Sequence, residues 1–357
     1  MNRIAVSLGM LTLVSHSLVY AGRGFEVKGV LSAESESFPK SDFRFSVRVA
    51  GGLWNIHAEP EGQAAVTFYE DAFDGAYVYY YEKLRLADGD RGVNTSLGII
   101  ESGKDVPSES STLAPPLWLA FCSSQFFKTA RANSMPGLFG SGYEKRPLGS
   151  KLTFARELHP AFPNLPKAVD LFSDGTAYSR VAGGTVEVSK FPAPFDKGFL
   201  EASFRALSFT NFAGFNIPQT FKLDIYLPRI SGGSSKDVIR VMTWKGEVRS
   251  MSTETNALPA SFTPLTDGKT LTEDRRFPPV GRHGVRVNYL NTNAMGRWTE
   301  AKTAAKVHTA LTRNDQIIGR QTLHASPPKN KRYVFIAMAL LWSIPLFICL
   351  RRILRRT

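Results

Sequence analysis

The sequence predicts a mainly β protein with a few helices, of the α+β class, whose antiparallel sheet is followed by one C-terminal transmembrane helix. Three observations support this prediction: apolar and polar residues alternate with period two, glycine-rich turns separate the alternating runs, and a long uncharged run lies near the C-terminus. Period-two alternation places successive side chains on opposite faces of a strand, so that one face is buried and the other meets water.

Met1–Ala21 has the pattern of a secretory signal peptide. One base, Arg3, precedes the apolar stretch Ile4–Val14, and Val19 and Ala21 stand at the positions that signal peptidase reads. We therefore expect cleavage after Ala21 and export of the domain that follows, with an uncleaved N-terminal anchor as the alternative.

The next segment, residues 22–150, is predicted to begin as an antiparallel meander. In Asp42–Val49 the odd positions are apolar and the even positions are polar. Ala50-Gly51-Gly52 supplies a tight turn, and Leu53–Ala58 returns as the partner strand. This spacing is typical of a hairpin with one buried face.

A second hairpin and a short helix are expected in the same segment. Asp74-Gly75 joins the alternating runs Ala64–Glu70 and Ala76–Leu84. Pro115-Pro116 then opens the stretch Leu117–Ala130, whose apolar residues recur at roughly helical spacing. We expect this helix, near 113–130, to pack on the sheet.

Residues 151–312 are predicted to be a second β-rich segment, either part of the same domain or a second domain packed against it. Glycine and proline favour loops at Gly137–Ser150 and Pro160–Pro166. We therefore expect the boundary between the two β-rich segments to lie somewhere in that interval. The expected strands of this segment are Thr176–Val181, Thr185–Val188, Phe221–Leu227, Val238–Trp244 and Val285–Leu290.

The C-terminal region is predicted to be a helix, a stem, an anchor and a tail. Alanine content favours a helix at Ala301–Leu311, and residues 313–332 form the stem. The uncharged run Tyr333–Leu350 would span about 27 Å as a helix, close to the hydrocarbon thickness of a bilayer, and residues 351–357 carry four arginines. We expect a single-pass protein of the bacterial inner membrane, with its main domain on the periplasmic face and its basic tail among lipid headgroups in the cytoplasm.

The basic composition does not indicate a nucleic-acid partner. Eight of the 44 Lys and Arg residues lie in the signal peptide and the anchor region, which leaves 36 against 31 acidic residues for Gly22–Pro328. No basic run with interleaved aromatic residues remains in this part, so we expect no nucleic-acid binding.

No motif for catalysis, a metal or a cofactor is complete. The glycine spacing of Gly137–Gly142 fails as a phosphate loop because Tyr143 stands where a lysine is needed. His57-Ala58-Glu59 lacks the cysteines of a zinc deaminase site. Cys122 is expected in the exported domain and Cys349 inside the anchor, so we do not expect them to form a disulfide. We therefore expect no catalytic residue, no metal site and no cofactor, although a triad assembled in space stays open.

The aromatic content suggests a ligand site. The chain has 25 Phe, 11 Tyr and 5 Trp, which predict a large β core. A sharper hypothesis is that Trp54, Phe68, Tyr79 and Tyr81 line one face of a curved sheet and hold an apolar ligand.

The first meander resembles the half-barrel envelope proteins that carry lipoproteins. The similarity covers about residues 43–84, where a strand with Trp54 and a Pro60 turn precede Tyr69-Glu70, Asp74-Gly75 and Tyr79-Tyr80-Tyr81. The resemblance implies a curved antiparallel sheet or half-barrel with a helix plugging its concave side, and it assigns no functional residue. The C-terminal anchor is a departure from the soluble carriers.

Three functions follow as hypotheses. The first is a membrane-anchored, non-catalytic envelope protein whose exported β domain binds an apolar or lipid-like ligand, or a lipidated partner. The second is a structural or assembly subunit that docks another envelope protein by strand addition. The third is a membrane-tethered hydrolase, which would need His and Ser or Asp to converge in a cleft.

Overall fold

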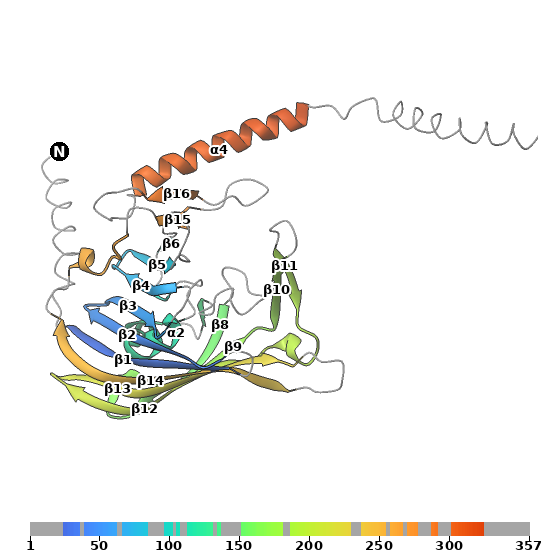
Figure 1. Cartoon of the computed structure of the whole chain (residues 1–357). Coiled ribbons are helices and arrows are strands. Elements are labelled where there is room, and N and C mark those ends of the chain that lie inside the picture. The colour runs from blue at the N-terminus through green and yellow to red at the C-terminus, as the bar shows by residue number, and fades with distance from the viewer. Residues whose placement is uncertain are drawn as a thin grey trace, which may run out of the picture.

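One large sheet organises the part of the chain that the structure describes (Figure 1). The structure is a computed structural model, and it describes residues 24–35, 39–62, 66–84, 96–102, 105–107, 113–130, 134–136, 151–180, 186–229, 237–254, 258–266, 270–277, 287–291 and 301–324.

The sheet has 14 strands in the order β16-β15-β6-β5-β4-β3-β2-β1-β14-β13-β12-β9-β8-β7, and β10 and β11 form a separate pair. All neighbours are antiparallel except β6 and β15, which are parallel. The strands are β1 Gly24–Ser35, β2 Ser41–Ala50, β3 Leu53–Pro60, β4 Val66–Phe73, β5 Tyr77–Leu84, β6 Ser96–Ser102, β7 Ser134–Pro136, β8 Lys151–His159, β9 Phe162–Ser173, β10 Thr176–Arg180, β11 Val186–Lys190, β12 Phe199–Phe212, β13 Phe215–Pro228, β14 Val238–Glu254, β15 Thr270–Asp274 and β16 Val287–Asn291.

The predicted class is confirmed in its main terms: the protein is mainly β, largely antiparallel, with few helices. Both predicted β-rich segments contribute strands to the same sheet, because β1 pairs with β2 on one side and with β14 on the other. Of the described helices, none combines the length and apolar composition that crossing a bilayer requires. The predicted signal peptide, anchor and tail lie outside the described residues.

Alternation in the sequence produces a sheet with two different faces. On β2 the side chains of Phe45 and Val47 are buried, whereas Arg44, directly before Phe45, is exposed. We call the face that carries Phe45 and Val47 the inner face, and the opposite one the outer face. The register of β2 with β3 matches the predicted hairpin through Gly51 and Gly52.

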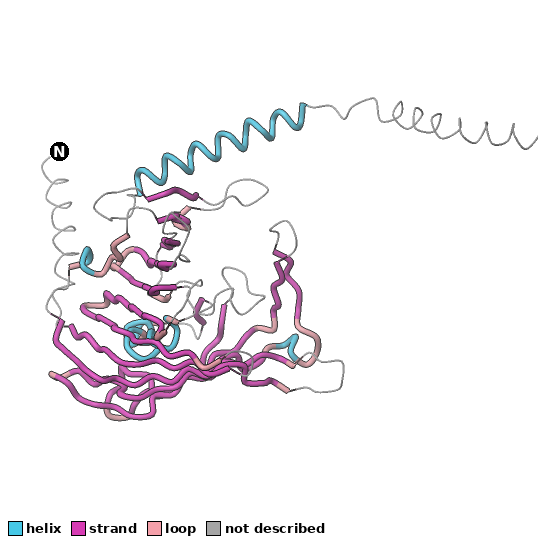
Figure 2. The backbone as a smooth tube through the Cα atoms, viewed as in Figure 1, coloured by secondary structure: helices cyan, strands magenta, loops and turns pink. Residues whose placement is uncertain are grey.

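A helical segment, Ala114–Thr129, fills the centre of the inner face, and we call it the plug (Figure 2). It consists of α2 Ala114–Leu117, the π-helical turn η1 Trp118–Cys122 and α3 Ser124–Thr129. Prolines occupy the first turn of α2, where no amide donor is needed. The predicted helix near 113–130 is therefore confirmed, and the strands curve around it.

Two glycines allow close approaches within the sheet. A side chain on Gly246 would overlap the ring of Phe221, and one on Gly29 would overlap the backbone of Glu247. Glycine within a strand commonly marks such a close approach or a bend.

The outer face of the first half is covered by residues 258–266, which include η4 Pro259–Ser261. Phe262 is fully buried against Ala50 and Leu53. Arg48 donates to the Ser261 carbonyl at 2.6 Å and lies 5.2 Å from the centre of the Phe262 ring. This covering explains why part of the outer face is buried rather than exposed to solvent.

Helix α4, Ala301–His324, begins beside β16 and extends away from the sheet (Figure 1). Its buried Ala304 and the stacked rings of His308 and Phe277, 5.3 Å apart, fix its first turns. The helix includes the predicted stretch Ala301–Leu311 and continues into the residues predicted to be the stem.

One loop prediction is wrong. The proline-containing stretch Pro160–Pro166 was expected to be a loop, but β9 begins at Phe162 and contains Pro163 and Pro166. The pairing of β8 with β9 shifts register at this place, and proline is accepted at strand ends and irregularities because its missing amide donor is not needed there. The predicted loop Gly137–Ser150 lies outside the described residues.

Candidate functional site

A cavity of about 430 Å³ lies at one end of the sheet. Register places the β2–β3, β8–β9 and β12–β13 turns at this end, together with the start of β1, and we call it the hairpin end. The cavity lies between these turns and the plug, and its lining residues are Phe25, Val49, Ala50, Gly51, Ala120, Phe121, Ser124, Ala161, Leu165, Gly214, Phe215, Asn216, Ile217 and Pro218.

None of the 14 lining residues carries a charge. Ser124 and Asn216 are the polar side chains among them, and the amide of Asn216 already accepts a hydrogen bond from Asn211 at 2.7 Å. The side chains of the wall are thus mainly apolar, while backbone groups of the turns add polar surface, and this volume lies within the ordinary range for small-molecule pockets.

Small residues and tight turns create the space. The β12–β13 turn places Ala213 and Gly214 at positive φ, 49° and 88°, as a two-residue hairpin with the twist of its strands requires. Next to this turn the rings of Phe215 and Phe25 lie 5.2 Å apart and form one wall. Ala120, on the plug, is too small to reach across.

The centre of the inner face, by contrast, is filled. The ring of Phe121 on the plug lies 5.4 Å from that of Phe221 and 6.0 Å from that of Phe45. Trp118 is fully buried and packs against Phe126 and Phe127. A ligand at the centre would have to displace these side chains, whereas the hairpin end offers existing space.

The segment leading into the plug is fastened to the sheet by a part-buried hydrogen bond. The indole N–H of Trp54 donates to the carboxylate of Asp105 at 2.8 Å. Burial raises the pKa of Asp105 to about 7, although this hydrogen bond favours the charged form. The thiol of Cys122 is also buried, and burial raises its pKa well above the ordinary value.

The four predicted site residues are divided between the two faces, and none lines the cavity. Trp54 lies on the inner face, fully buried. Phe68, Tyr79 and Tyr81 share the outer face, where the rings of Phe68 and Tyr81 are 5.4 Å apart and the Tyr79 hydroxyl donates to Asp74 at 2.7 Å. Burial raises the pKa of the Tyr79 hydroxyl. Tyr79 and Tyr81 are buried and pack with Phe68 in one cluster.

The cavity-lining residues were missed because they come from turns that are distant in sequence. Val49–Gly51, Ala161 and Phe215–Pro218 meet only after the sheet has formed. The one usable signal was Ala213-Gly214 between Phe212 and Phe215, which has the form of a two-residue hairpin turn beside aromatic residues.

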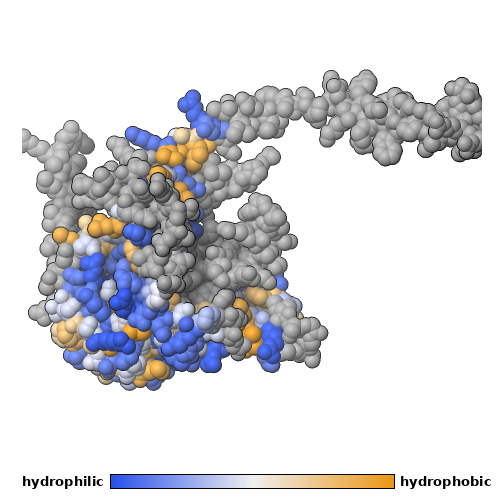
Figure 3. Space-filling view, in the orientation of Figure 1, coloured by the Kyte–Doolittle hydropathy of each residue, from blue (hydrophilic) through white to orange (hydrophobic). Residues whose placement is uncertain are grey.

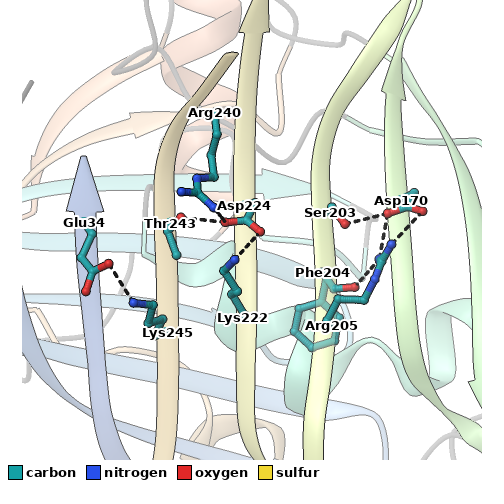
Figure 4. A network of polar contacts seen from close by, with 10 residues as sticks. All are labelled: Glu34, Asp170, Ser203, Phe204, Arg205, Lys222, Asp224, Arg240, Thr243 and Lys245. Carbon is teal, nitrogen blue, oxygen red and sulfur yellow. Dashed lines mark hydrogen bonds and ion pairs between the residues drawn. The ribbon is translucent and has the colours of Figure 1, made fainter. Parts of the chain in front are cut away.

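The outer face of the second half carries paired charges rather than a site (Figure 4). Arg205 contacts both carboxylate oxygens of Asp170, at 2.8 and 3.1 Å, and Lys222 pairs with Asp224 at 2.8 Å. Burial alone would raise the pKa of Asp170, but the bonds from Arg205 and Ser203 lower it. The described surface over the lower strands is accordingly mostly hydrophilic in Figure 3.

The described histidines lie in separate places. His57 is 3.2 Å from Glu59, the His159 ring lies 4.5 Å from the tilted ring of Phe209, and His308 stacks on Phe277. Among the described residues, no three His, Cys, Asp or Glu side chains are grouped to hold a metal ion.

No protein-family model and no curated protein matches this chain. Solved structures match over about two thirds of it. A DUF1329 family protein from Desulfovibrio piger is 8% identical, with 67% of this chain and 88% of the other covered and a TM-score of 0.27. A LolA superfamily protein from Nitrosomonas europaea is 10% identical, with 64% and 85% covered and a TM-score of 0.28.

A domain from Vibrio parahaemolyticus, described as an outer membrane lipoprotein-sorting protein, is 7% identical, with 68% of this chain and 91% of the other covered and a TM-score of 0.29. Structures of the kind that the first meander resembles are thus among those that the chain matches.

Proposed function

We propose that this protein is a non-catalytic, membrane-anchored envelope protein that binds the uncharged, apolar part of a ligand in the hairpin-end cavity. The observation that supports the proposal best is the cavity itself, about 430 Å³ with no charged side chain in its wall. A charged ligand group would lose its hydration there without a partner, so the bound part is apolar, such as one alkyl chain.

The membrane location rests on the sequence. The apolar run Tyr333–Leu350 and the leader Met1–Ala21 support an exported domain held at a bilayer. Helix α4 begins at the β16 edge and has 24 residues, so it extends about 36 Å toward the C-terminal segment. The cavity is then available to ligands on the exported side.

The other hypotheses have less support. Docking through an outer edge of the sheet would use β7 or β16, and these described edge strands have only three and five residues. Short edges are a common means of preventing strand addition. A hydrolase would need converging groups, whereas His57, His159 and His308 each contact a different part of the molecule.

The experiment is native mass spectrometry of the full chain in detergent, titrated with 1-monopalmitoylglycerol, an uncharged single-chain lipid. Ala161→Phe places a ring at the cavity wall and is expected to lower the affinity at least tenfold. The matched control is Ala310→Phe, the same change at an exposed position of α4.

Equal affinity in Ala161→Phe and Ala310→Phe would show that the lipid binds elsewhere. No one-to-one complex with the unmodified chain at concentrations below those that saturate the detergent would overturn the proposal.

A further inference from the structure

Two cations come from neighbouring positions where the plug meets β8. Arg156 is on the inner face of β8, because it donates a hydrogen bond to the Phe127 carbonyl of the plug and its guanidinium lies 5.8 Å from the centre of the Phe127 ring. That carbonyl belongs to the peptide group that joins Phe127 to Lys128. Both basic side chains are exposed, so two positive charges meet the solvent at this boundary.

The two cations border the hairpin-end cavity. Ser124 lines the cavity and stands four residues before Lys128 in α3, which places their Cβ atoms about 5–6 Å apart on one side of the helix. Leu165 also lines the cavity, and the β9 residue after it pairs with Leu158, two residues beyond Arg156. Two residues of a strand span about 7 Å. One molecule can therefore occupy the cavity and contact both cations.

Neither cation is ion-paired with an acidic side chain in the part of the chain that the structure describes. The outer face differs, because Arg205, Lys222 and Lys245 each pair with a carboxylate at 2.8 Å (Figure 4). Arg156 uses one N–H group to hold the plug, and the other donors of its planar fork can serve a second acceptor. The geometry of that fork suits a phosphate or a carboxylate. The inner-face pair of cations is therefore matched by an anionic group.

We propose that the ligand is a single-chain anionic lipid. Its alkyl chain lies in the hairpin-end cavity, whose wall has no charged side chain, and its phosphate or carboxylate head contacts Arg156 and Lys128 beside the cavity. Charge-assisted hydrogen bonds then replace part of the hydration that the head loses when the chain enters. The inference rests on the proposed function and names the class of ligand for the same cavity.

The test compares 1-monopalmitoylglycerol with 1-palmitoyl lysophosphatidate, which differs from it by one phosphate group. Native mass spectrometry of the full chain in an uncharged detergent measures both affinities, and lysophosphatidate is expected to bind about tenfold more tightly. Palmitate is measured in the same way, and the tighter of the two anionic lipids identifies the head group as phosphate or carboxylate. Equal affinity for all three lipids would overturn the inference.

Lys128→Gln and Arg156→Gln remove the two charges one at a time. Each is expected to weaken the binding of lysophosphatidate roughly three- to tenfold and to leave that of 1-monopalmitoylglycerol unchanged. The matched controls are Lys306→Gln and Arg249→Gln, the same changes at exposed positions of α4 and β14, which should change neither affinity. Because Arg156 also holds the plug, Lys128→Gln decides the test if Arg156→Gln lowers the melting temperature.

This inference and the proposed function fail in different ways. Ala161→Phe, at the cavity wall, is expected to weaken both lipids, whereas the two charge variants weaken only the anionic one. If Ala161→Phe weakens 1-monopalmitoylglycerol but the preference for the anionic lipid survives both charge changes together, the cavity proposal stands and this inference is overturned. If Ala161→Phe and Ala310→Phe bind 1-monopalmitoylglycerol equally, the chain lies elsewhere and both are overturned.

Discussion

The centre of the inner face and its hairpin end are built on the same strands, yet one is filled and the other is hollow. At the centre, Phe221 rests on Gly246 while Phe121 of the plug meets its ring at 5.4 Å. At the hairpin end, the Phe25–Phe215 pair forms a wall with space behind it. The centre is filled because Gly246 lets the Phe221 ring lie directly on the backbone. Space remains at the hairpin end, where three turns reverse the chain.

The largest effect should come from opening the centre. Trp118→Ala removes a fully buried indole that packs against Phe126 and Phe127. The free energy of unfolding is expected to fall by about 3–5 kcal/mol, as for other large-to-small changes of buried aromatic residues. Urea unfolding followed by circular dichroism measures it, and a loss below about 1 kcal/mol would mean that the plug is loosely packed.

A second test concerns the contact between Gly246 of β14 and the ring of Phe221. Gly246→Ala introduces a methyl group that overlaps the Phe221 ring, so the free energy of unfolding should fall by about 1–3 kcal/mol. In the Phe221→Leu background the same change should cost less, because the ring is gone. Equal costs in the two backgrounds would show that the ring does not rest on Gly246.

The sequence predicted the filled region better than the hollow one, for a physical reason. Alternation identified Phe45 and Val47 as buried, and Pro115-Pro116 identified the start of the plug, since both signals are local. The cavity depends on long-range register, which brings Val49 close to Phe215. Trp54 and Phe68 were grouped as one surface, but the pairing register puts them on opposite faces.

Strand limits show the same division between local and long-range information. β12, Phe199–Phe212, was not predicted because its apolar residues do not alternate along its whole length. The register shifts near Ser208 interrupt the period by changing which residues face the plug. The strong alternation of Phe221–Leu227 predicted the middle of β13 but not its extension to Phe215, which includes Pro218.

A third test uses pH to examine how the plug is fastened. Burial raises the pKa of Asp105 to about 7 in the folded protein, above the value of about 3.9 in an unfolded chain. The folded state therefore holds an extra proton between these values, and stability should fall as pH rises from about 4 to about 7. We expect a loss of roughly 1–2 kcal/mol, less than the full shift implies, because Asp105 is only half-buried.

Asp105→Asn is the matched control, since its amide oxygen can still accept from Trp54. Its stability should fall less over this range than that of the unmodified protein, because burial also raises the pKa of Glu70 and this slope is the same in both. Asp170 contributes the opposite slope, because its lowered pKa gives stability that is lost as the pH falls. If the unmodified protein and Asp105→Asn had the same profile from pH 4 to 7, Asp105 would not titrate as described.

The smallest effect is expected at the hairpin end, and it tests the comparison most directly. Phe215→Ala removes an aromatic ring, as a change at Phe121 would, but Phe215 is half-buried and already borders empty space. The lost contact with Phe25 should cost about 1 kcal/mol, because little additional packing is broken. Urea unfolding measures this cost beside that of Trp118→Ala. A loss as large as that of Trp118→Ala would mean that the hairpin end is packed as tightly as the centre. A loss near 1 kcal/mol would mean that the cavity leaves the Phe215 ring with few contacts beyond Phe25.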